Sequence, residues 1–520
     1  MRVGRRLSRM VVALVAASTV AACGSSAAEP TGGSVPNDGT PRQGGELTMS
    51  RLSQLNSLDS ALCSSSAYYI CAALYGTLAR YSFEDQKFEP AMAESFESSD
   101  GKVWTLKLRS GTKFTDGTPY DAEAVAFNWE RLKDPALLSF AGYWLAQMTW
   151  KVVDPLTLEI TLASTNYQFP WALQYDLGSI ASPAAIKAKG EKFATEPVGA
   201  GPFLVDTWVP GSQIQLKRNP GYVEKGLPYL DRITYATVVQ DDQRVNALRA
   251  GQVDLTATFL KRFGRELQPE GYGVHAIPLF GGTGLGFNLK DPIIGDPDLR
   301  QALLHAFNAP QLTAAAYPGD EPPDAFFPKD SPNRDAAVTY PKFDLTEAQR
   351  LFDAYLAKTG KTSLNLEMLT YSPAPIMKQV GEVVAAQLNK INGLHVELKP
   401  TENAVIGRLF REGKFQISVH ASVISQSPVT VYRTFYTGGD LNVYGYSNPK
   451  VDAALDTTIH STDANEVAAA WKVVGAEISK DAPNRLFAYE QDVILAAKHV
   501  HGVNPVTLYA ASPELLWVDK

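Results

Sequence analysis

The sequence lacks the features that mark several large classes of protein. Its 48 basic and 55 acidic residues leave a net charge of -7 without a basic run, which argues against nucleic acid as a partner. It contains no G-x-S-x-G, HExxH, P-loop or dinucleotide-binding motif, so we do not expect an enzyme. Beyond residue 22, no apolar stretch approaches the roughly 20 residues that a transmembrane helix needs. These absences agree with an exported body that does not itself enter the membrane.

Two patterns that could suggest cofactor or metal chemistry have the wrong spacing for it. The glycine-rich stretch 281–286 (GGTGLG) does not fit the G-x-G-x-x-G fingerprint. His499 and His501 lie two residues apart, on one face of an expected strand, without a third ligand nearby. We therefore expect a structural role for both histidines, no bound metal and no cofactor.

The N-terminus has the layout of an export signal. Several arginines precede the apolar stretch 10–22, and a basic region followed by an apolar one is typical of a signal peptide. The stretch ends in Val-Ala-Ala-Cys (20–23), which resembles the lipobox at which bacterial lipoproteins are cleaved and acylated. We expect residues 1–22 to be a lipoprotein signal peptide and Cys23 to carry the lipid. An ordinary cleavage site beside a chance cysteine is the alternative.

The segment after the expected cleavage site is rich in Gly, Ser and Pro and has no apolar cluster. This composition is typical of a flexible linker, so residues 23–43 predict a tether between the lipid and the folded body. Two or more acyl chains hold a protein firmly at a membrane. We therefore expect an exported protein, anchored by lipid to the outer face of the cytoplasmic membrane.

The two remaining cysteines, Cys63 and Cys71, form an even pair in an oxidising compartment. Their separation of eight residues suits a local disulfide and excludes a CxxC redox motif. Two reduced cysteines in the core are the alternative.

Hydrophobic periodicity predicts a body of mixed strands and helices. Alternating apolar residues indicate strands near 44–49, 104–108 and 156–162. A helix is expected to begin after Asp121, an N-capping residue, and a longer one is expected over 376–391. Mixed elements without internal repeats favour an α/β or α+β protein of several lobes.

Six stretches of the chain carry a resemblance to a known family. They are LYGTL (74–78) with PAMA (90–93), LKLRSGTKFTDGTPYDAEAVAFNWERL (106–132), VGAGPFLVDTWVPGSQIQLKRNPGY (198–222), LPYLDRITY (227–235), GFNLKDPIIGDPDLRQALLHAFN (286–308) and YGYSNPKVDAAL (444–455). In sequence and in order they resemble the peptide- and nickel-type extracellular solute-binding proteins, family 5 of the binding proteins of ABC transporters. No single stretch decides the resemblance, which depends on their common order.

The resemblance implies an α/β fold of the periplasmic-binding-protein type: a two-lobed clamp of the large peptide-binding class (type II) with an extra inserted subdomain in lobe I. Two crossing strands, near 284–288 and 493–499, are expected to form the hinge. The expected parts are 44–75, 196–285 and 495–520 for the core of lobe I, 76–195 for the inserted subdomain and 286–494 for lobe II.

The function implied by the resemblance is capture of a small molecule between the lobes. The expected ligand is a peptide or a solute of similar size, delivered by a monomeric protein to the membrane permease of an ABC importer. A ligand that touches both lobes favours the closed state by its differential affinity. Oligosaccharides and metal chelates are alternative ligands, and a protein that only senses its ligand is an alternative function.

The segment 419–439 is where the resemblance places ligand specificity. Dipeptide- and oligopeptide-binding relatives carry an aspartate there that pairs with the free amine of the peptide. Anchored on Pro428, the pattern places Ile424 at that position. A buried ammonium needs a paired charge, so free-amine peptides need another carboxylate here.

The segment offers neutral polar groups, aromatic rings and one arginine, a set that suits a neutral or weakly charged ligand. Arg433 could also bind a carboxylate bidentately. From the specificity segment, the candidate ligand-binding residues are His420, Ser422, Ser425, Gln426, Tyr432, Arg433 and Tyr436. From lobe I, the candidates are Tyr69, Tyr143 and Trp144 as aromatic walls and Arg51, just after the first strand. A packing or surface role is the alternative for each.

Overall fold

The computed structural model describes residues 39–52, 55–63, 67–83, 85–137, 139–372, 374–507 and 510–519. The expected signal peptide, Cys23 and most of the expected tether lie outside the described residues. All the described residues belong to one compact unit, 34–520. None of the helices found in these ranges is both long enough and apolar enough to span a bilayer.

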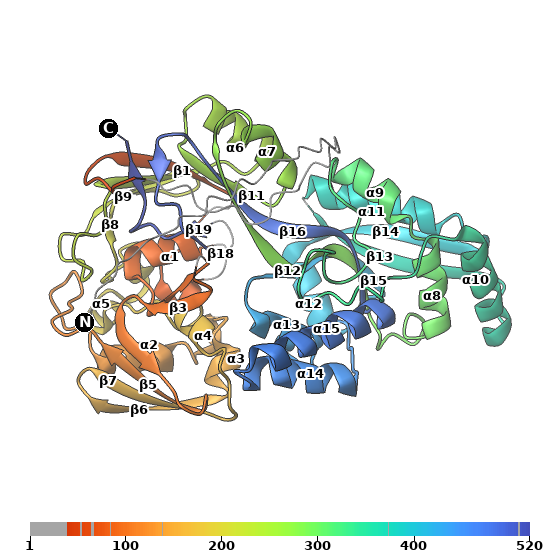
Figure 1. Cartoon of the computed structure of the whole chain (residues 1–520), viewed down its shortest axis with the longest axis horizontal. Coiled ribbons are helices and arrows are strands. Elements are labelled where there is room, and N and C mark those ends of the chain that lie inside the picture. The colour runs from red at the N-terminus through yellow and green to blue at the C-terminus, as the bar shows by residue number, and fades with distance from the viewer. Residues whose placement is uncertain are drawn as a thin grey trace, which may run out of the picture. The chain divides into compact units, whose positions relative to one another are not determined.

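A large mixed sheet collects strands from the beginning, the middle and the end of the chain (Figure 1). Its strand order is β14-β13-β15-β12-β16-β11-β1-β10-β9-β8. The bounds are β1 (Glu46–Arg51), β8 (Phe203–Val209), β9 (Gln213–Arg218), β10 (Arg232–Thr237), β11 (Leu255–Thr258), β12 (Gly273–Phe287), β13 (Leu364–Ser372), β14 (Leu394–Glu402), β15 (Ile417–Ser425) and β16 (Asn484–Ala496).

Two long antiparallel strands, β12 and β16, lie at the centre of this sheet. The first part of β12, residues 273–278, pairs with residues 491–496 of β16, which also pairs with β11. The last part, residues 282–286, pairs with residues 484–489 on one side and with β15 on the other. The two strands therefore connect the part of the sheet around β1 with the part around β13.

The glycine-rich stretch sits where β12 changes register, between Pro278 and Gly282. Gly281 has a φ of 82°, and a Cβ on it would lie 2.4 Å from the Ser422 carbonyl oxygen. A Cβ on Gly282 would lie 2.0 Å from the Ala488 carbonyl oxygen. Glycine is required here because the neighbouring backbones approach too closely for any side chain.

Each part of the large sheet contains three parallel strands. In one, β1 pairs in parallel with β10 and with β11, and helix α6 (Asp241–Arg249) joins β10 to β11. In the other, β13 pairs in parallel with β14 and β15, through helices α11 (Pro375–Leu388) and α12 (Asn403–Glu412). Crossovers of this kind leave a crevice at the carboxyl ends of the strands, where α/β proteins commonly bind ligands.

A separate sheet of order β4-β5-β7-β6 lies in the segment expected to form the inserted subdomain. Its strands are β4 (Ala93–Glu97), β5 (Val103–Leu108), β6 (Met148–Asp154) and β7 (Thr157–Leu162). The short pairs are β2 (Ala79–Ser82) with β3 (Lys87–Pro90), β17 (Val500–His501) with β20 (Trp517–Val518), and β18 (Pro505–Thr507) with β19 (Ala510–Ala511).

The remaining helices surround these sheets (Figure 1). Their bounds are η1 (Ser60–Leu62), α1 (Tyr68–Tyr75), α2 (Ala122–Arg131), η2 (Pro135–Leu137), α3 (Gly142–Leu145), α4 (Pro170–Gln174), α5 (Pro183–Lys189), η3 (Gly190–Ala194), α7 (Lys261–Leu267), α8 (Pro297–Ala306), α9 (Ala309–Ala316), α10 (Leu345–Thr359), α13 (Pro428–Phe435), α14 (Pro449–His460) and α15 (Ala464–Asp481).

Local sequence signals account for several of these elements. Trp104, Leu106 and Leu108 are buried on one face of β5, as their alternation predicts. Helix α2 begins after Asp121, whose carboxylate accepts a hydrogen bond of 2.9 Å from the Ala124 backbone N–H. The predicted helix near 376–391 is confirmed as α11, which is three residues shorter at its C-terminal end.

The described apolar residues form two large cores and one small core. One large core contains residues of β1, α1, the β4-β5-β7-β6 sheet and the C-terminal segment. The second runs from Leu285 to Ala488, and the small one joins α6, α7 and β16. Along β16 the packing changes from the second core at Tyr489 to the small core at Val493.

This change of core lies before most of the hinge segment 493–499 that the sequence suggests. On β12 the register shift between Pro278 and Gly282 likewise precedes the suggested segment 284–288. A second register shift lies between Thr283 and Gly284, at the start of that segment. The proline and five glycines of β12 conceal a continuous strand in the sequence. The two hinge segments stay a prediction.

A disulfide joins Cys63 to Cys71, as their spacing predicts, with a Cα–Cα distance of 5.9 Å. Cys63 caps η1, and Cys71 lies in the middle of α1. The bond therefore ties the connection that follows β1 to the helix that packs in the same core.

Replacing both Cys63 and Cys71 with serine should lower the free energy of unfolding by about 2.5 kcal/mol. The loss follows from the extra entropy that the unfolded chain gains when an eight-residue loop is opened. Urea titration of wild type with and without reductant, beside the double variant, measures it. Reduced wild type should match the variant, and an unchanged midpoint in both would contradict the prediction.

Candidate functional site

The expected specificity segment, 419–439, runs from β15 through the whole of α13 to Gly439 and contributes to the second core. On β15, His420 and Ser422 are both almost fully buried. The ring of His420 lies 2.9 Å from the Ser418 hydroxyl through Nδ1 and 2.9 Å from the Tyr444 hydroxyl through Nε2. The Tyr444 hydroxyl donates a hydrogen bond of 2.6 Å to the Ser422 hydroxyl, which also accepts one from Asn484.

Both ring nitrogens of His420 therefore lie within hydrogen-bond distance of a hydroxyl, and a neutral ring can donate through one nitrogen and accept through the other. Burial lowers the pKa of His420 to about 4. The ring also packs against Phe410 and directly over Gly286, where a Cβ would approach its Cε1 to 2.3 Å.

The sequence analysis expected His420 and Ser422 to offer free donors and acceptors to a ligand. The structure instead engages both inside the second core, because Ser418, His420 and Ser422 share the face of β15 that Tyr444 and Phe410 cover. Their role here is to complete a buried polar network. The side chain of Ile424, at the position of the expected aspartate, lies outside what the structure describes.

Ser425 and Gln426 stand at the carboxyl end of β15. The Ser425 hydroxyl accepts hydrogen bonds from the Ser427 backbone N–H and the Thr430 hydroxyl, so it shapes the entry into α13. The side-chain oxygen of Gln426, Oε1, accepts a hydrogen bond of 3.3 Å from the Tyr175 hydroxyl. The side-chain nitrogen, Nε2, is buried without a hydrogen-bond partner among the described residues.

Tyr432 and Tyr436 are stacked, with ring centroids 4.5 Å apart and planes at 21°. Both are half-buried, and the Tyr432 hydroxyl donates to the Asp456 carboxylate over 3.2 Å. Burial raises the pKa of Tyr432, with Asp456 adding to the effect. The pair can present an aromatic surface at the edge of the second core.

Arg433 makes contacts with both large cores. Its guanidinium donates two hydrogen bonds to the Asp440 carboxylate, at 2.9 and 2.6 Å. The same group lies 4.5 Å from the centroid of the Tyr143 ring on α3, which belongs to the first core. Burial raises the pKa of the nearby Asp176 carboxyl to about 6, although Arg433 opposes the rise. The Arg433 guanidinium is therefore a charged group that contacts residues of both cores.

Trp144, which the sequence suggests as an aromatic wall, is buried in this structure. It is 4 % exposed and lies in the first core, with its ring edge-on to Tyr143 and to Phe169 at centroid distances of 5.2 and 5.6 Å. Large apolar rings at the start of a short helix are indistinguishable, in sequence, from rings that line a pocket. Tyr143 itself remains half-buried.

Arg51 and Tyr69 meet in the first core, at the carboxyl end of β1. Both line a cavity of about 10 Å³ together with Met49, Ser50, Leu52, Tyr235 and Ala257. Ring contact with Tyr235, at 4.9 Å, holds Tyr69 in place. The structure thus brings together two candidates that are 18 residues apart in sequence.

Three further residues, Tyr175, Asp176 and Asp440, lie beside candidate residues in the structure. They belong to no sequence motif, so the sequence gives no signal for them.

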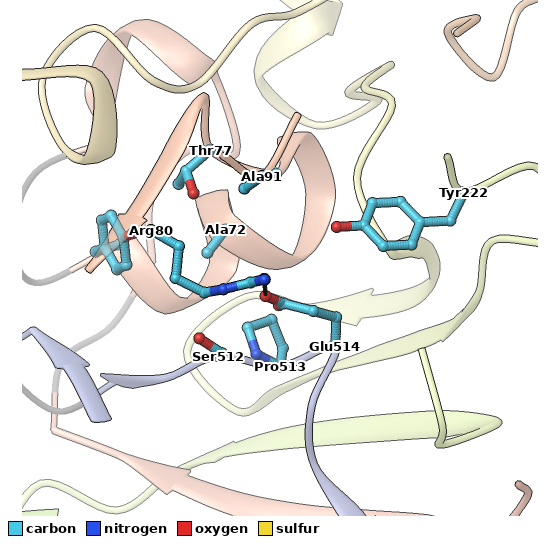
Figure 2. Close-up of a pocket in the computed structure, with 10 residues that line it drawn as sticks. Ala72, Thr77, Arg80, Ala91, Tyr222, Ser512, Pro513 and Glu514 are labelled. Carbon is cyan, nitrogen blue, oxygen red and sulfur yellow. Dashed lines mark hydrogen bonds and ion pairs between the residues drawn. The ribbon is translucent and has the colours of Figure 1, made fainter. Parts of the chain in front are cut away.

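A second small cavity lies between α1, β2 and the C-terminal segment (Figure 2). There the Arg80 guanidinium and the Glu514 carboxylate point toward each other and form an ion pair. Glu224 pairs with the same arginine at 3.5 Å and accepts a hydrogen bond from the Tyr222 hydroxyl. The charges of this cavity are satisfied by one another, which is typical of a structural link.

Further polar contacts join the two large parts of the structure. The Asp320 carboxylate pairs with Lys261 at 3.3 Å and with Arg265 at 2.8 Å. The Tyr167 backbone N–H donates to the Ile459 carbonyl oxygen over 2.9 Å.

The two histidines near the C-terminal segment each contact a carboxylate: His499 contacts Asp254, and His501 contacts Asp519. The described residues contain no group of three or more side chains suited to a metal ion.

Residues 87–442 match the family described as bacterial extracellular solute-binding proteins, family 5. The chain belongs to this family. The sequence resemblance is confirmed by this match over more than half of the chain.

Curated relatives of this family 5 protein include glutathione-binding proteins named GsiB. The protein from Pectobacterium atrosepticum is 28 % identical over 446 residues, covering 82 % of this chain and 85 % of its own. The protein from Escherichia coli O1:K1 / APEC is 32 % identical over 240 residues. That alignment covers 45 % of this chain and spans about half, 47 %, of the relative.

Solved structures with the same fold include two binding proteins with ligands. AgaA from A. tumefacien R10, in complex with agropinic acid, has a TM-score of 0.76 and 24 % identity, and covers 92 % of this chain and 99 % of its own. DppA from Helicobacter pylori, in complex with the peptide STSA, has a TM-score of 0.76 and 23 % identity over the same shares. These likenesses confirm the α/β, two-lobed clamp fold.

The neutral His420 makes this family 5 protein less stable in acid. The pKa of His420 is 6.5 in the unfolded chain and about 4 in the folded protein. Between these pH values the unfolded chain binds a proton that the folded protein does not, so the free energy of unfolding falls as the pH drops from 6.5 toward 4. At pH 5 the loss should be on the order of 2 kcal/mol.

Urea unfolding of wild type and His420→Gln at pH 7.5 and 5 isolates this effect. Wild type should lose more stability between the two pH values than the variant does, whatever the stability of the variant at pH 7.5. Equal losses would show that His420 is not held neutral in the core.

Proposed function

We propose that this chain captures a small solute between its two lobes and delivers it to the permease of an ABC importer. The contacts of Arg433 support this proposal. Its guanidinium binds the Asp440 carboxylate and lies over the ring of Tyr143, which packs against the other core. A ligand that bridges such groups favours the state in which they meet. A permease can then distinguish the closed form from the open one.

We assign the lobes as the sequence suggests: 44–75, 196–285 and 495–520 for the core of lobe I, 76–195 for its inserted subdomain and 286–494 for lobe II. The distribution of the cores supports this assignment. The second core contains residues from Leu285 to Ala488, and the C-terminal segment packs in the first.

The ligand that we favour is a peptide or a solute of similar size. The curated relatives are glutathione-binding proteins, and a neighbouring structure contains the peptide STSA. Oligosaccharides remain an alternative. Metal chelates are disfavoured for His420, because both of its ring nitrogens are engaged within lobe II.

We also propose that Cys23 carries the lipid that anchors the protein, on the sequence pattern around residues 20–23. Wild type should partition with membranes and yield an acylated N-terminal peptide in mass spectrometry. Cys23→Ala should appear in the soluble fraction. A wild-type protein that is soluble and begins with an unmodified residue would contradict lipid anchoring.

A thermal-shift screen of residues 44–520 against peptides of two to five residues tests the function. A ligand at 100 times its dissociation constant adds about 2.7 kcal/mol to the free energy of unfolding. At least one peptide should raise Tm clearly. If the folded protein responds to no peptide, the ligand belongs to another chemical class.

Arg433→Ala should weaken binding of such a peptide about tenfold, because the closed state loses the contact of the guanidinium with Tyr143. The stability of the ligand-free protein should change little. Titration calorimetry measures the affinity, and Arg350→Ala, which removes an exposed ion pair with Glu347 on α10, is the matched control. Equal affinities for wild type and Arg433→Ala would place the binding site elsewhere.

A further inference from the structure

Arg51 is a buried cation without a counter-charge among the described residues. Its side chain is 2 % exposed, and all three guanidinium nitrogens lack a hydrogen-bond partner in the described part of the chain. None of the ion pairs found among the described residues includes it either. An unpaired charge in a protein interior is strongly unfavourable, so the position requires an explanation.

Other buried arginines of the described residues are bonded at least in part. Arg244, on α6 in the same lobe, is 1 % exposed. It donates to the carbonyl oxygens of Ala257, Val238 and Val239 and to the Asp241 carboxylate. Arg80 pairs with both Glu514 and Glu224. Arg485 donates to the carbonyl oxygens of Pro323 and Leu486, although its Nε has no partner among the described residues. The missing partner of Arg51 is therefore a departure from the chain's own pattern.

Tyr69 adds a second unpartnered group to the same cavity. Its hydroxyl is buried and makes no hydrogen bond of ordinary geometry with the described residues. Burial raises the pKa of this hydroxyl and the nearby Arg51 guanidinium opposes the rise, so the group remains a proton donor at neutral pH. The Ser50 hydroxyl is already bonded to Thr256. The cavity thus contains the guanidinium of Arg51 and the hydroxyl of Tyr69, both donors without a hydrogen bond of ordinary geometry to the described residues.

The place of Arg51 in the fold is that of a binding residue. It ends β1, which lies between the parallel strands β10 and β11, and the chain crosses from one of these to the other through α6. Ligands of α/β proteins bind outside such carboxyl ends. In lobe II, the free amide nitrogen of Gln426 follows the carboxyl end of β15.

Contacts link Gln426 to the helix that carries Tyr69. The Gln426 carbonyl oxygen accepts from the Tyr175 hydroxyl, and the Tyr175 ring lies 5.3 Å from that of Tyr68 on α1. The carboxyl ends of parallel strands in both lobes therefore approach α1. This is the arrangement expected if a ligand is held between them.

We propose that Arg51 and Tyr69 bind a carboxylate of the transported solute, which is therefore an organic acid such as a peptide with a free carboxyl terminus. A carboxylate brings the single negative charge that neutralises one guanidinium, and its two oxygens accept from the guanidinium fork and the Tyr69 hydroxyl. The cavity of about 10 Å³ has room for about one water in this structure, so a carboxylate enters only when the cavity widens. This assignment rests on the proposed function and names the class of ligand.

The first test compares two buried arginines in the absence of ligand. Arg51→Met removes no hydrogen bond of ordinary geometry with the described residues, so Tm should stay the same or rise. Arg244→Met, the matched control, breaks several hydrogen bonds and should lower Tm. A fall in Tm for Arg51→Met as large as that for Arg244→Met would overturn the proposal, because it would show that Arg51 has a structural partner.

The second test uses acetate, the smallest convenient carboxylate, at constant ionic strength. Acetate should raise Tm of wild type more than that of Arg51→Met. An equal response of the two proteins would overturn the carboxylate site, even if peptides bind.

The third test compares peptides of two to five residues as free acids and as carboxyl-terminal amides. Wild type should bind an acid at least about 30-fold more tightly than its amide, and Arg51→Met should lose this preference. Binding without any preference would overturn the carboxylate site while the solute-binding function stands. An acetate response specific to Arg51 without binding of any peptide would support the site and reject peptides as the ligand class.

Discussion

The pairing of β12 with β16 holds the two lobes in one structure. β16 contributes residues to all three cores, whereas β12 contributes to the second core and packs against the small one through Val274. Their register shifts at Gly281 and Gly282, where only hydrogen atoms fit between neighbouring backbones. The parallel strands of each lobe attach to the two sides of this pair. The positions of Arg51 at the end of β1 and of Gln426 after β15 therefore both depend on it.

Buried polar groups divide into two kinds in this protein. The network of His420, Tyr444, Ser422 and Asn484 is bonded through the ring, the hydroxyls and the Asn484 side-chain nitrogen, although the Asn484 Oδ1 has no partner among the described residues. Arg51 and Tyr69 are buried without hydrogen-bond partners among the described residues. Groups of the first kind specify a fold, whereas those of the second are tolerated where a ligand completes them. The contrast distinguishes packing from recognition more clearly than residue type does.

Sequence reasoning succeeded where the signal is local. The Asp121 cap, the alternation in β5 and the disulfide between Cys63 and Cys71 each depend on residues close in the chain. The burial of His420 and Trp144 does not follow from the sequence, because a residue that lines a pocket and one that packs in a core look alike until the covering elements are known. The continuity of β12 was concealed by its glycines and proline. The free state of Arg51 depends on partners that only the fold can supply or withhold.

The long strand β16 also constrains the order in which the protein can fold. Residues 484–496 pair with residues of β11 and β12 that lie 198 to 241 positions earlier in the chain. Pairing across such sequence distances is slow to form. Because β16 lies between β12 and β11, a chain truncated before Asn484 lacks the strand that joins the two halves of the large sheet. The sheet can become continuous only after this late segment has joined it.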